Sequence, residues 1–145
     1  MEKILLIEDD KRLSDSLVKL FHLEGLATDP VETLHDLYFL LNSPSNYDTI
    51  VLDRILNGLD SKNYIQKIKA KWPQTAILIL SAINTPIERA ELINMGADDY
   101  LGKPFSSSEL VARLISLQRR YSFTSSHYVN IGNTSIDLLR RTLTG

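Results

Sequence analysis

The sequence contains no cysteine, no long apolar run and no surplus of positive charge. Without cysteine, neither a disulfide framework nor a thiolate metal site is possible. No stretch is long and apolar enough to cross a bilayer, and the first residues lack the layout of a signal peptide, so we expect a cytoplasmic protein with no membrane association. The formal net charge of -2 argues against a basic surface for nucleic acid.

The composition is that of an ordinary globular domain. The chain has 145 residues, of which 43% are hydrophobic and 23% are charged, and this balance excludes a disordered or fibrous chain. Its length accommodates one compact domain with a buried core, but it is short for two complete domains. We therefore expect one full domain followed by a remnant of a second.

Short, uninterrupted apolar runs alternate along the chain with helical patterns. The runs lie at residues 4–7, 49–52 and 76–80, and such runs are typical of parallel strands that are covered on both faces. Apolar residues recur at helical spacing over residues 13–21 and 110–117. This alternation predicts helices that pack against both faces of a parallel sheet.

Two weaker segments complete the predicted sheet. Residues 27–31 contain Pro30, which cannot donate a hydrogen bond to a neighbouring strand and therefore indicates an edge strand. Residues 98–101 supply a fifth strand. Five βα units in about 120 residues form a domain of typical size, and they predict a doubly wound α/β fold.

Polar side chains follow the predicted strands at their carboxyl ends, where open α/β sheets bind ligands. Carboxylates that cluster there repel one another and favour a bound cation, and hard oxygen ligands suit Mg²⁺. One carboxylate can then attack phosphorus, while a hydroxyl and an ammonium group share the charge of the phosphoryl oxygens. The side chains expected at this edge are Glu8, Asp9, Asp53, Ser81 and Lys103.

The four segments at residues 4–10, 51–53, 80–82 and 96–105 together resemble the receiver domains of two-component response regulators. Their order, spacing and strand placement match jointly, which makes the combined signal strong although each piece alone is weak. The resemblance covers residues 1–120 and implies a flavodoxin-like (βα)5 fold with a doubly wound parallel sheet of strand order 2-1-3-4-5. The segments that carry it are ILLIEDD at 4–10, VLD at 51–53, LSA at 80–82 and GADDYLGKPF at 96–105.

The resemblance gives each candidate residue a role. It implies that Asp53 accepts a phosphoryl group from a sensor histidine kinase, and that the chain is a switch that assists its own phosphorylation and dephosphorylation rather than a turnover enzyme. The residues implied for phosphoryl transfer are Asp53, Ser81 and Lys103, and those implied for Mg²⁺ are Glu8, Asp9, Asp53 and the main-chain carbonyl of Ile55.

The resemblance also implies a conformational readout. On phosphorylation Ser81 would move toward the phosphoryl group and Tyr100 would turn inward, which would shift the face formed by helix four, strand five and helix five. In the OmpR/PhoB type, which the chain resembles, this face forms a two-fold homodimer through ion pairs between subunits. The matching candidates are Arg89 with Glu109, Asp98 with Arg120, and Asp99 with Arg113.

The tail resembles the opening strands of an OmpR/PhoB winged-helix effector domain. Two short strand-like runs within residues 128–145 flank Gly132-Asn133, which is a hairpin signal, and residues 121–127 form a polar linker. The sequence includes no recognition helix and no wing. DNA binding and transcriptional control are therefore implied for a longer parent protein and not for this chain.

Several residues near Asp53 depart from the family pattern or tune it. Asn57 stands where a proline is common, which predicts a more mobile loop. Arg54 could contact a phosphate or point to solvent. Ile55 and Ile83, at positions that tune phosphate lifetime in the family, are apolar and cannot orient an attacking water, so we expect slow self-dephosphorylation.

Other functions fit parts of the pattern. An aspartyl-phosphate phosphatase would need a second Asp where Ile55 stands. A flavodoxin-like cofactor binder would need a donor-rich loop after the first strand, and the acidic run at residues 8–10 would repel phosphate there. A receiver-like interaction module that works without phosphorylation is the serious alternative, because the loop after Asp53 is altered.

Overall fold

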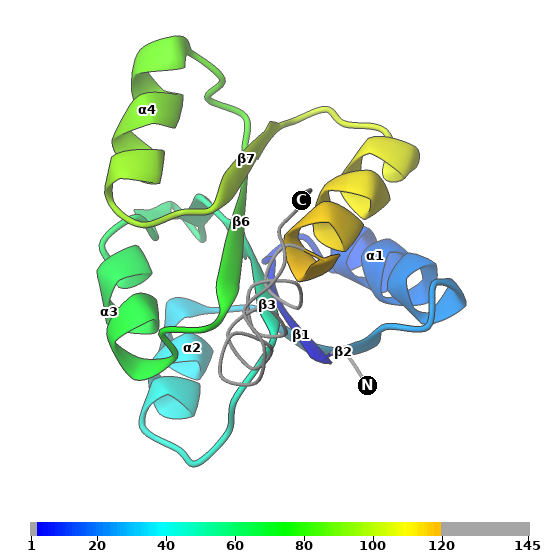
Figure 1. Cartoon of the computed structure of the whole chain (residues 1–145), viewed down its shortest axis with the longest axis horizontal. Coiled ribbons are helices and arrows are strands. Elements are labelled where there is room, and N and C mark those ends of the chain that lie inside the picture. Colours follow the sequence, from blue (N-terminus) through cyan, green and yellow to red (C-terminus); the bar gives the residue numbers. More distant parts are fainter. Residues whose placement is uncertain (1–2, 120–145) are drawn as a thin grey trace, which may run out of the picture.

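A computed structural model describes residues 3–119 of the chain. Strands and helices alternate through this region (Figure 1). In chain order they are β1 (Lys3–Ile7), α1 (Lys11–Leu23), β2 (Ala27–Val31), α2 (Leu34–Leu41), β3 (Thr49–Asp53), β4 (Ile55–Leu56), β5 (Leu59–Asp60), α3 (Tyr64–Lys71), β6 (Ala76–Ser81), α4 (Pro86–Asn94) and β7 (Asp99–Gly102).

A last helix is described over residues 107–119. The predicted linker at 121–127 and the predicted effector strands at 128–145 lie outside the described residues, as does Arg120. Within the described region, no helix has both the length and the apolar character needed to cross a membrane.

Five parallel strands form the main sheet in the order β2-β1-β3-β6-β7. Counted along this sheet alone, the order is 2-1-3-4-5, so the predicted flavodoxin-like, doubly wound topology is confirmed. Pro30 lies in β2 at the edge of the sheet, as its missing N–H group requires.

The helices cover both faces of the sheet. In Figure 1, α2, α3 and α4 lie on one side, and α1 lies with the last described helix on the other. Alternate residues of β1 divide between two cores, because successive side chains of a strand point to opposite faces. Leu5 and Ile7 pack with residues of α2, α3 and α4, whereas Ile4 and Leu6 pack with residues of α1 and of the last helix.

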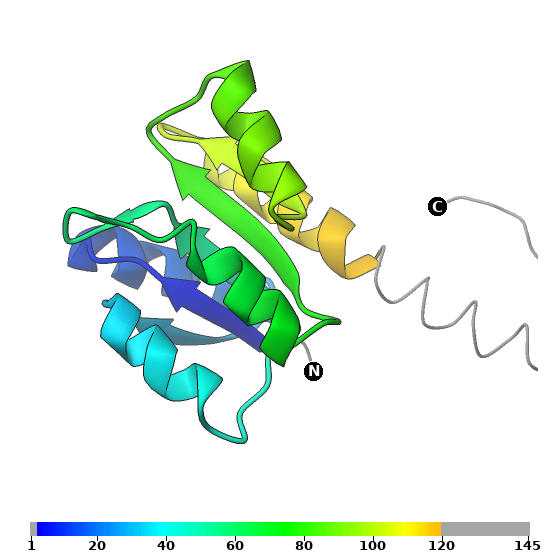
Figure 2. The ribbon, with the colours of Figure 1, turned by 90° about the vertical axis from the view of Figure 1, so that its left-hand side faces the viewer.

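All five parallel strands direct their carboxyl ends to one edge of the sheet, called here the carboxyl edge. In Figure 2 the arrowheads of β1, in dark blue, and of β6, in green, point to the same end of the molecule. The loops at this edge cover residues 8–10, 54–63, 82–85 and 103–106. The opposite, amino edge carries the loops that precede β3, β6 and β7.

A small hairpin that the sequence analysis did not predict lies at the carboxyl edge. β4 and β5 pair antiparallel and are joined by Asn57 and Gly58, whose φ angles are 51° and 80°. Positive φ at both central residues is the signature of a type I′ turn, for which Asn-Gly is the preferred pair. The backbone N–H of Asn57 donates to Asp9 Oδ2 at 2.8 Å, so the segment expected to be a loop is a hydrogen-bonded turn.

Candidate functional site

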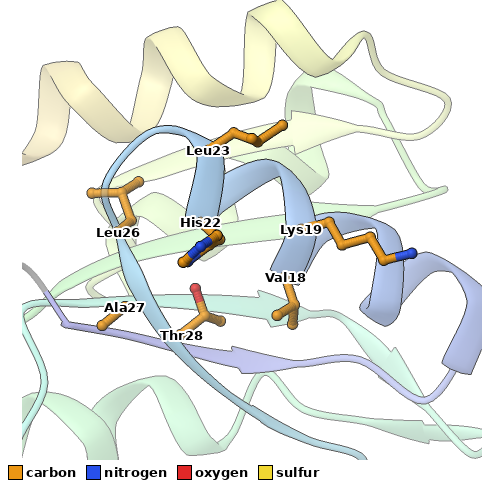
Figure 3. Close-up of a pocket in the computed structure, with 7 residues that line it drawn as sticks. All are labelled: Val18, Lys19, His22, Leu23, Leu26, Ala27 and Thr28. Atoms are coloured by element: carbon orange, nitrogen blue, oxygen red, sulfur yellow. The ribbon is translucent and has the colours of Figure 1, made fainter.

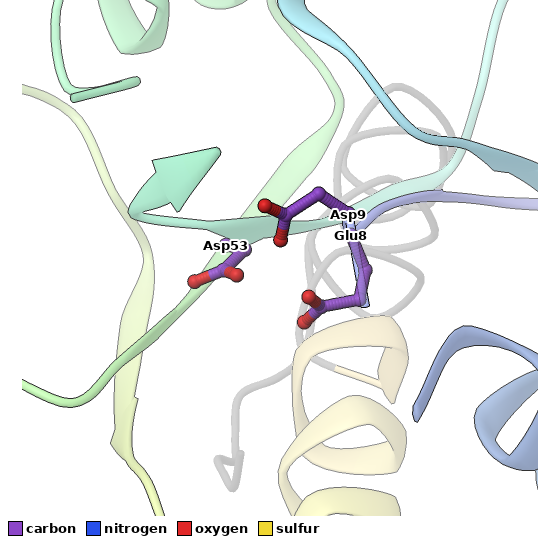
Figure 4. A group of neighbouring side chains, drawn as sticks. All are labelled: Glu8, Asp9 and Asp53. Carbon is purple, nitrogen blue, oxygen red and sulfur yellow. The ribbon is translucent and has the colours of Figure 1, made fainter. Parts of the chain in front are cut away.

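Three carboxylates meet at the carboxyl edge. Glu8 and Asp9 directly follow β1, and Asp53 is the last residue of β3. One oxygen from each lies within 4.8 Å of the others, and Figure 4 shows the three side chains converging from the two strand ends. Glu8 and Asp53 are buried, whereas Asp9 is half-buried. The predicted acidic cluster is therefore present.

Lys103 enters the same cluster from the segment after β7. Its Nζ atom lies 3.1 Å from Asp53 Oδ2 and 3.2 Å from Glu8 Oε1. The backbone N–H of Lys103 donates to the carbonyl oxygen of Ser81 at 2.7 Å, which holds this segment against the end of β6. One ammonium group thus faces three carboxylates.

The buried setting changes the protonation of this group. Burial raises the pKa of Glu8 to about 7, with a further contribution from the nearby charge of Asp53, although a hydrogen bond from the Asp10 N–H and the charge of Lys103 oppose the rise. Burial acts to lower the pKa of Lys103, but attraction to Asp53 and Glu8 outweighs it and the pKa is raised. Lys103 therefore stays charged at neutral pH.

The donor set fits a hard divalent cation. All three acidic side chains offer carboxylate oxygens, which Mg²⁺ prefers over nitrogen or sulfur ligands. The mutual repulsion that helps to raise the pKa of Glu8 would be relieved by a bound cation. Ile55 follows Asp53 by two residues at the start of β4, so its carbonyl belongs to the same loop.

Ser81 ends β6 beside this cluster and is buried. In the sheet, Asp53 is paired with Leu80, so Ser81 lies one residue beyond the level of Asp53. Its hydroxyl oxygen accepts a hydrogen bond from the N–H of Ile83 at 3.0 Å. The hydroxyl is therefore held by the loop that leads from β6 into α4.

Tyr100 lies in β7 and is buried, with 4% of its surface exposed. Among the described residues its hydroxyl group has no hydrogen-bond partner. The guanidinium of Arg89, from α4, lies 5.8 Å from the centre of the ring. The ring is thus already turned inward in this structure.

The proposed dimer residues make contacts within the chain. Arg113 lies 3.0 Å from Asp99 and 3.2 Å from Glu109, and the hydrogen bonds that it donates to Asp99 are the main reason that the pKa of Arg113 is raised. Asp98 pairs with Lys69 at 2.9 Å. Pairing between subunits stays a prediction. Arg120, the predicted partner of Asp98, lies outside the described residues.

Arg89 also has a partner in its own chain. It donates to Asn84 Oδ1 at 2.6 Å. Its predicted partner Glu109 instead contacts Arg113, as described above.

Of the two alternatives given for Arg54, exposure to solvent is wrong. Its side chain is buried between Asp60 and Glu88. These partners are six and 34 residues away in the sequence, and no periodicity or motif connects them to Arg54. Finding them would have required knowing that β4 pairs with β5 and that the first turn of α4 packs beside this hairpin.

A hollow of about 460 Å³ lies apart from the acidic cluster, between α1 and β2 (Figure 3). Its walls are mainly apolar, and none of its seven residues belongs to the acidic cluster. They are Val18, Lys19, His22, Leu23, Leu26, Ala27 and Thr28.

Comparison with known proteins places the chain in a family. Residues 4–115 match the model of the response regulator receiver domain family. The chain is 35% identical to the response regulator RppA of Synechocystis sp. over 136 residues, which cover 93% of this chain and 58% of that protein. It is 34% identical to the transcriptional regulatory protein BasR of Escherichia coli over 139 residues, which cover 96% and 62% of the two chains.

Solved structures show the same fold. The receiver domain of the Francisella response regulator 1452 superposes with a TM-score of 0.76 at 32% identity, covering 83% of this chain and 98% of that one. DrrB, a Thermotoga maritima OmpR/PhoB homolog, superposes with a TM-score of 0.74 at 27% identity, covering 83% and 54%. The chain spans 58% and 62% of the lengths of the two relatives named above.

Proposed function

Because the chain belongs to the response regulator receiver family, we propose that Asp53 accepts a phosphoryl group from a sensor histidine kinase. The observation that carries this proposal is the meeting of Asp53 with two further acids and Lys103 at the carboxyl edge, with Nζ of Lys103 3.1 Å from Asp53 Oδ2. A nucleophilic carboxylate, oxygen ligands for a cation and a fixed ammonium group are what phosphoryl transfer needs. The chain acts as a switch and not as a turnover enzyme.

The transfer needs no redox partner. An oxygen of the Asp53 carboxylate attacks phosphorus, and a P–O bond forms as the P–N bond of the phosphohistidine breaks. The electron pair of the broken bond stays on the imidazole nitrogen of the kinase. Lys103, which already pairs with Asp53, then balances the charge of the phosphoryl oxygens. To reset the switch, a water oxygen attacks phosphorus and a new P–O bond forms as the bond between phosphorus and the Asp53 oxygen breaks. The electron pair of the broken bond stays on the Asp53 carboxylate, and inorganic phosphate leaves with the protons of the water.

Glu8, Asp9, Asp53 and the main-chain carbonyl of Ile55 are the residues proposed to hold Mg²⁺. When bound, Mg²⁺ would offset the repulsion between the carboxylates and neutralise charge on the phosphoryl oxygens. The support is the donor set of three carboxylates within 4.8 Å. Asp9 is held in place by the hydrogen bond from the Asn57 N–H.

The movement proposed for the switch is that of Ser81, because Tyr100 already lies inward in this structure. Ser81 would leave its hydrogen bond with the Ile83 N–H and bind the phosphoryl group, and Tyr100 would keep its inward position. The face of α4, β7 and the last helix would then form a homodimer. In a longer protein a DNA-binding effector domain would use this dimer to control transcription, as the names of relatives such as BasR suggest.

The test is intact-mass spectrometry of the chain after incubation with Mg²⁺ and acetyl phosphate. We expect one added phosphoryl group that requires Mg²⁺ and is absent in Asp53→Ala. Asp15→Ala, which removes an exposed acid of α1, is the matched control and should keep the adduct. An adduct that survives in Asp53→Ala would place the acceptor elsewhere.

The altered loop after Asp53 supports one alternative, an interaction module that works without phosphorylation. Asn57 and Gly58 form a tight turn here. No adduct under any condition, together with a normally folded protein, would favour this alternative.

A further inference from the structure

The buried guanidinium of Arg54 joins two elements of the carboxyl edge. Its Nη2 lies 3.2 Å from Asp60 Oδ2 and its Nε 3.4 Å from Asp60 Oδ1, while Nη1 donates to Glu88 Oε1. Asp60 belongs to the β4–β5 hairpin, and Glu88 is the third residue of α4. One side chain, directly after the phosphoacceptor, therefore ties the hairpin to the first turn of α4.

The main chain of Arg54 is fixed on both sides. Its N–H donates to the carbonyl oxygen of Leu80 at 2.8 Å, and its own carbonyl oxygen accepts from the Ser61 N–H at 2.7 Å. The Ser61 hydroxyl in turn donates to the carbonyl oxygen of Asp53 at 2.8 Å. This backbone is held by β6 and by the loop before α3, and the guanidinium is itself buried and paired with Asp60, so it has little freedom to follow a movement of α4.

α4 has few other anchors. Leu92 is its one buried side chain, and the loop of residues 82–85 that leads into it is exposed. A second ion pair, between Lys62 and Glu91 at 3.4 Å, is more exposed than the Arg54–Glu88 pair. Exposed pairs contribute little, whereas a charge-assisted bond to a buried guanidinium is strong. The first turn of α4 is therefore held by the bond of Glu88 to Arg54 and by the contact of Arg89 with the Tyr100 ring, and of these two only the Arg54 bond reaches the segment that follows Asp53.

We propose that Arg54 is a positioning residue whose bond to Glu88 holds α4 in the arrangement seen in this structure and thereby opposes phosphorylation of Asp53. This inference rests on the proposed function. If Ser81 moves toward an acyl phosphate, the loop of residues 82–85 and the first turn of α4 are drawn with it. Glu88 then moves away from a guanidinium that cannot follow, so the bond and the phosphorylated arrangement compete.

The test measures the affinity of the full chain for beryllium fluoride, a phosphoryl analogue, with Mg²⁺ present. The amide NMR signals of Ser81 and Ile83 report binding. Glu88→Gln removes the charge but keeps the shape, and it leaves Arg54 paired with Asp60. We expect it to bind beryllium fluoride about 5-fold more tightly or better. A purely structural role would lower the unfolding temperature without tightening this affinity.

Glu91→Gln is the matched control, because it removes the same charge from the same helix. Its pair with Lys62 is exposed, so we expect a change of about 2-fold or less. In an Arg54→Met background, Glu88→Gln should likewise change the affinity by no more than about 2-fold, because the bond is already absent.

The outcomes separate the two proposals. Wild-type protein that binds beryllium fluoride, with Glu88→Gln no tighter than Glu91→Gln, overturns the role of Arg54 alone. A tightening that persists in the Arg54→Met background also overturns it. Wild-type protein that is folded but binds no beryllium fluoride overturns the proposed function, and the role of Arg54 with it.

Discussion

At the scale of single residues, the site is defined by an imbalance of charge. Lys103 contacts both Glu8 and Asp53, but it cannot neutralise three carboxylates. Burial adds a cost to the charged form of Glu8, whose pKa it raises to about 7. A divalent cation held by these carboxylates would relieve the repulsion at the carboxyl edge.

We predict that Mg²⁺ stabilises the folded chain through this cluster. At a concentration ten times its dissociation constant, Mg²⁺ should raise the free energy of unfolding by about 1.4 kcal/mol. Asp9→Asn should lose most of this gain, because Asp9 supplies one of the three carboxylates. Thermal unfolding followed by circular dichroism, with Mg²⁺ or with EDTA, measures the effect. Asp15→Asn should respond like the wild type, and an equal response from Asp9→Asn would contradict the metal assignment.

A second prediction concerns the lifetime of the acyl phosphate. Ile55 and Ile83 flank the site and are 41% and 39% exposed, yet neither side chain can orient water. Ile83→Glu or Ile55→Asn should shorten the half-life of phosphorylated Asp53 by about tenfold or more, because each adds a polar group that can position water. Mass spectrometry over time after removal of the phosphodonor measures the half-life. Ile87→Glu, at an exposed position of α4, should leave it unchanged, and unchanged half-lives in all three variants would refute the idea.

At the scale of elements, the β4–β5 hairpin decides how the loop after Asp53 is held. Its turn places Asn57 at a φ of 51° and directs the Asn57 N–H to Asp9. Proline, common here in the family, cannot adopt a positive φ and has no N–H to donate. In this chain the Asn57 turn and its hydrogen bond to Asp9 therefore fix the loop in place of a proline.

The third prediction follows from that geometry. Asn57→Pro should destabilise the chain by more than about 1 kcal/mol, because it strains the turn and removes a hydrogen bond. Asn57→Gly keeps the N–H group and tolerates the positive φ, so it should cost much less. Urea unfolding of both variants makes the comparison. If the proline variant were as stable as the glycine variant, the turn would not control this loop.

The elements were largely predictable because buried parallel strands leave a plain mark in a sequence. The runs at 4–7, 49–52 and 76–80 became β1, β3 and β6 with ends shifted by at most one residue. The acids that follow such strands share the carboxyl edge by topology alone, so their meeting could be predicted as well.

Contacts that depend on loop conformation and side-chain direction could not be predicted. The bonds of Arg54 to Asp60 and Glu88 need the hairpin to be closed and α4 to be docked, and neither condition is written in local periodicity. The Asn-Gly pair could have indicated the hairpin, but the strands that it joins have two residues each, too few to show alternation.

At the scale of the whole molecule, two hydrophobic cores share one sheet. Phe21 of α1 is fully buried in the core on one face, and Trp72, after α3, is buried in the core on the other. β1, β3 and β6 each contribute side chains to both cores. Loss of packing on one face of the sheet should therefore also destabilise the other face.

The fourth prediction tests this coupling. Phe21→Ala should lower the free energy of unfolding by about 3–5 kcal/mol, because it removes a large buried side chain. Trp72 fluorescence and circular dichroism should still give one coincident transition, although Phe21 and Trp72 lie in different cores. Leu23→Ala, on the same helix at a position 81% exposed, should leave the midpoint close to that of the wild type. Two separated transitions would show that the cores unfold independently.

The placement of all the chemistry at the carboxyl edge has a practical use for the study of this protein. The amino edge offers a position for chemical labelling, because Asn46, in the loop before β3, is exposed in the part of the chain that the structure describes. Because the sequence has no cysteine, Asn46→Cys would carry its only thiol. A fluorophore attached at that thiol would report rotational diffusion, and hence assembly, while Asp53 and the acidic cluster stay unmodified.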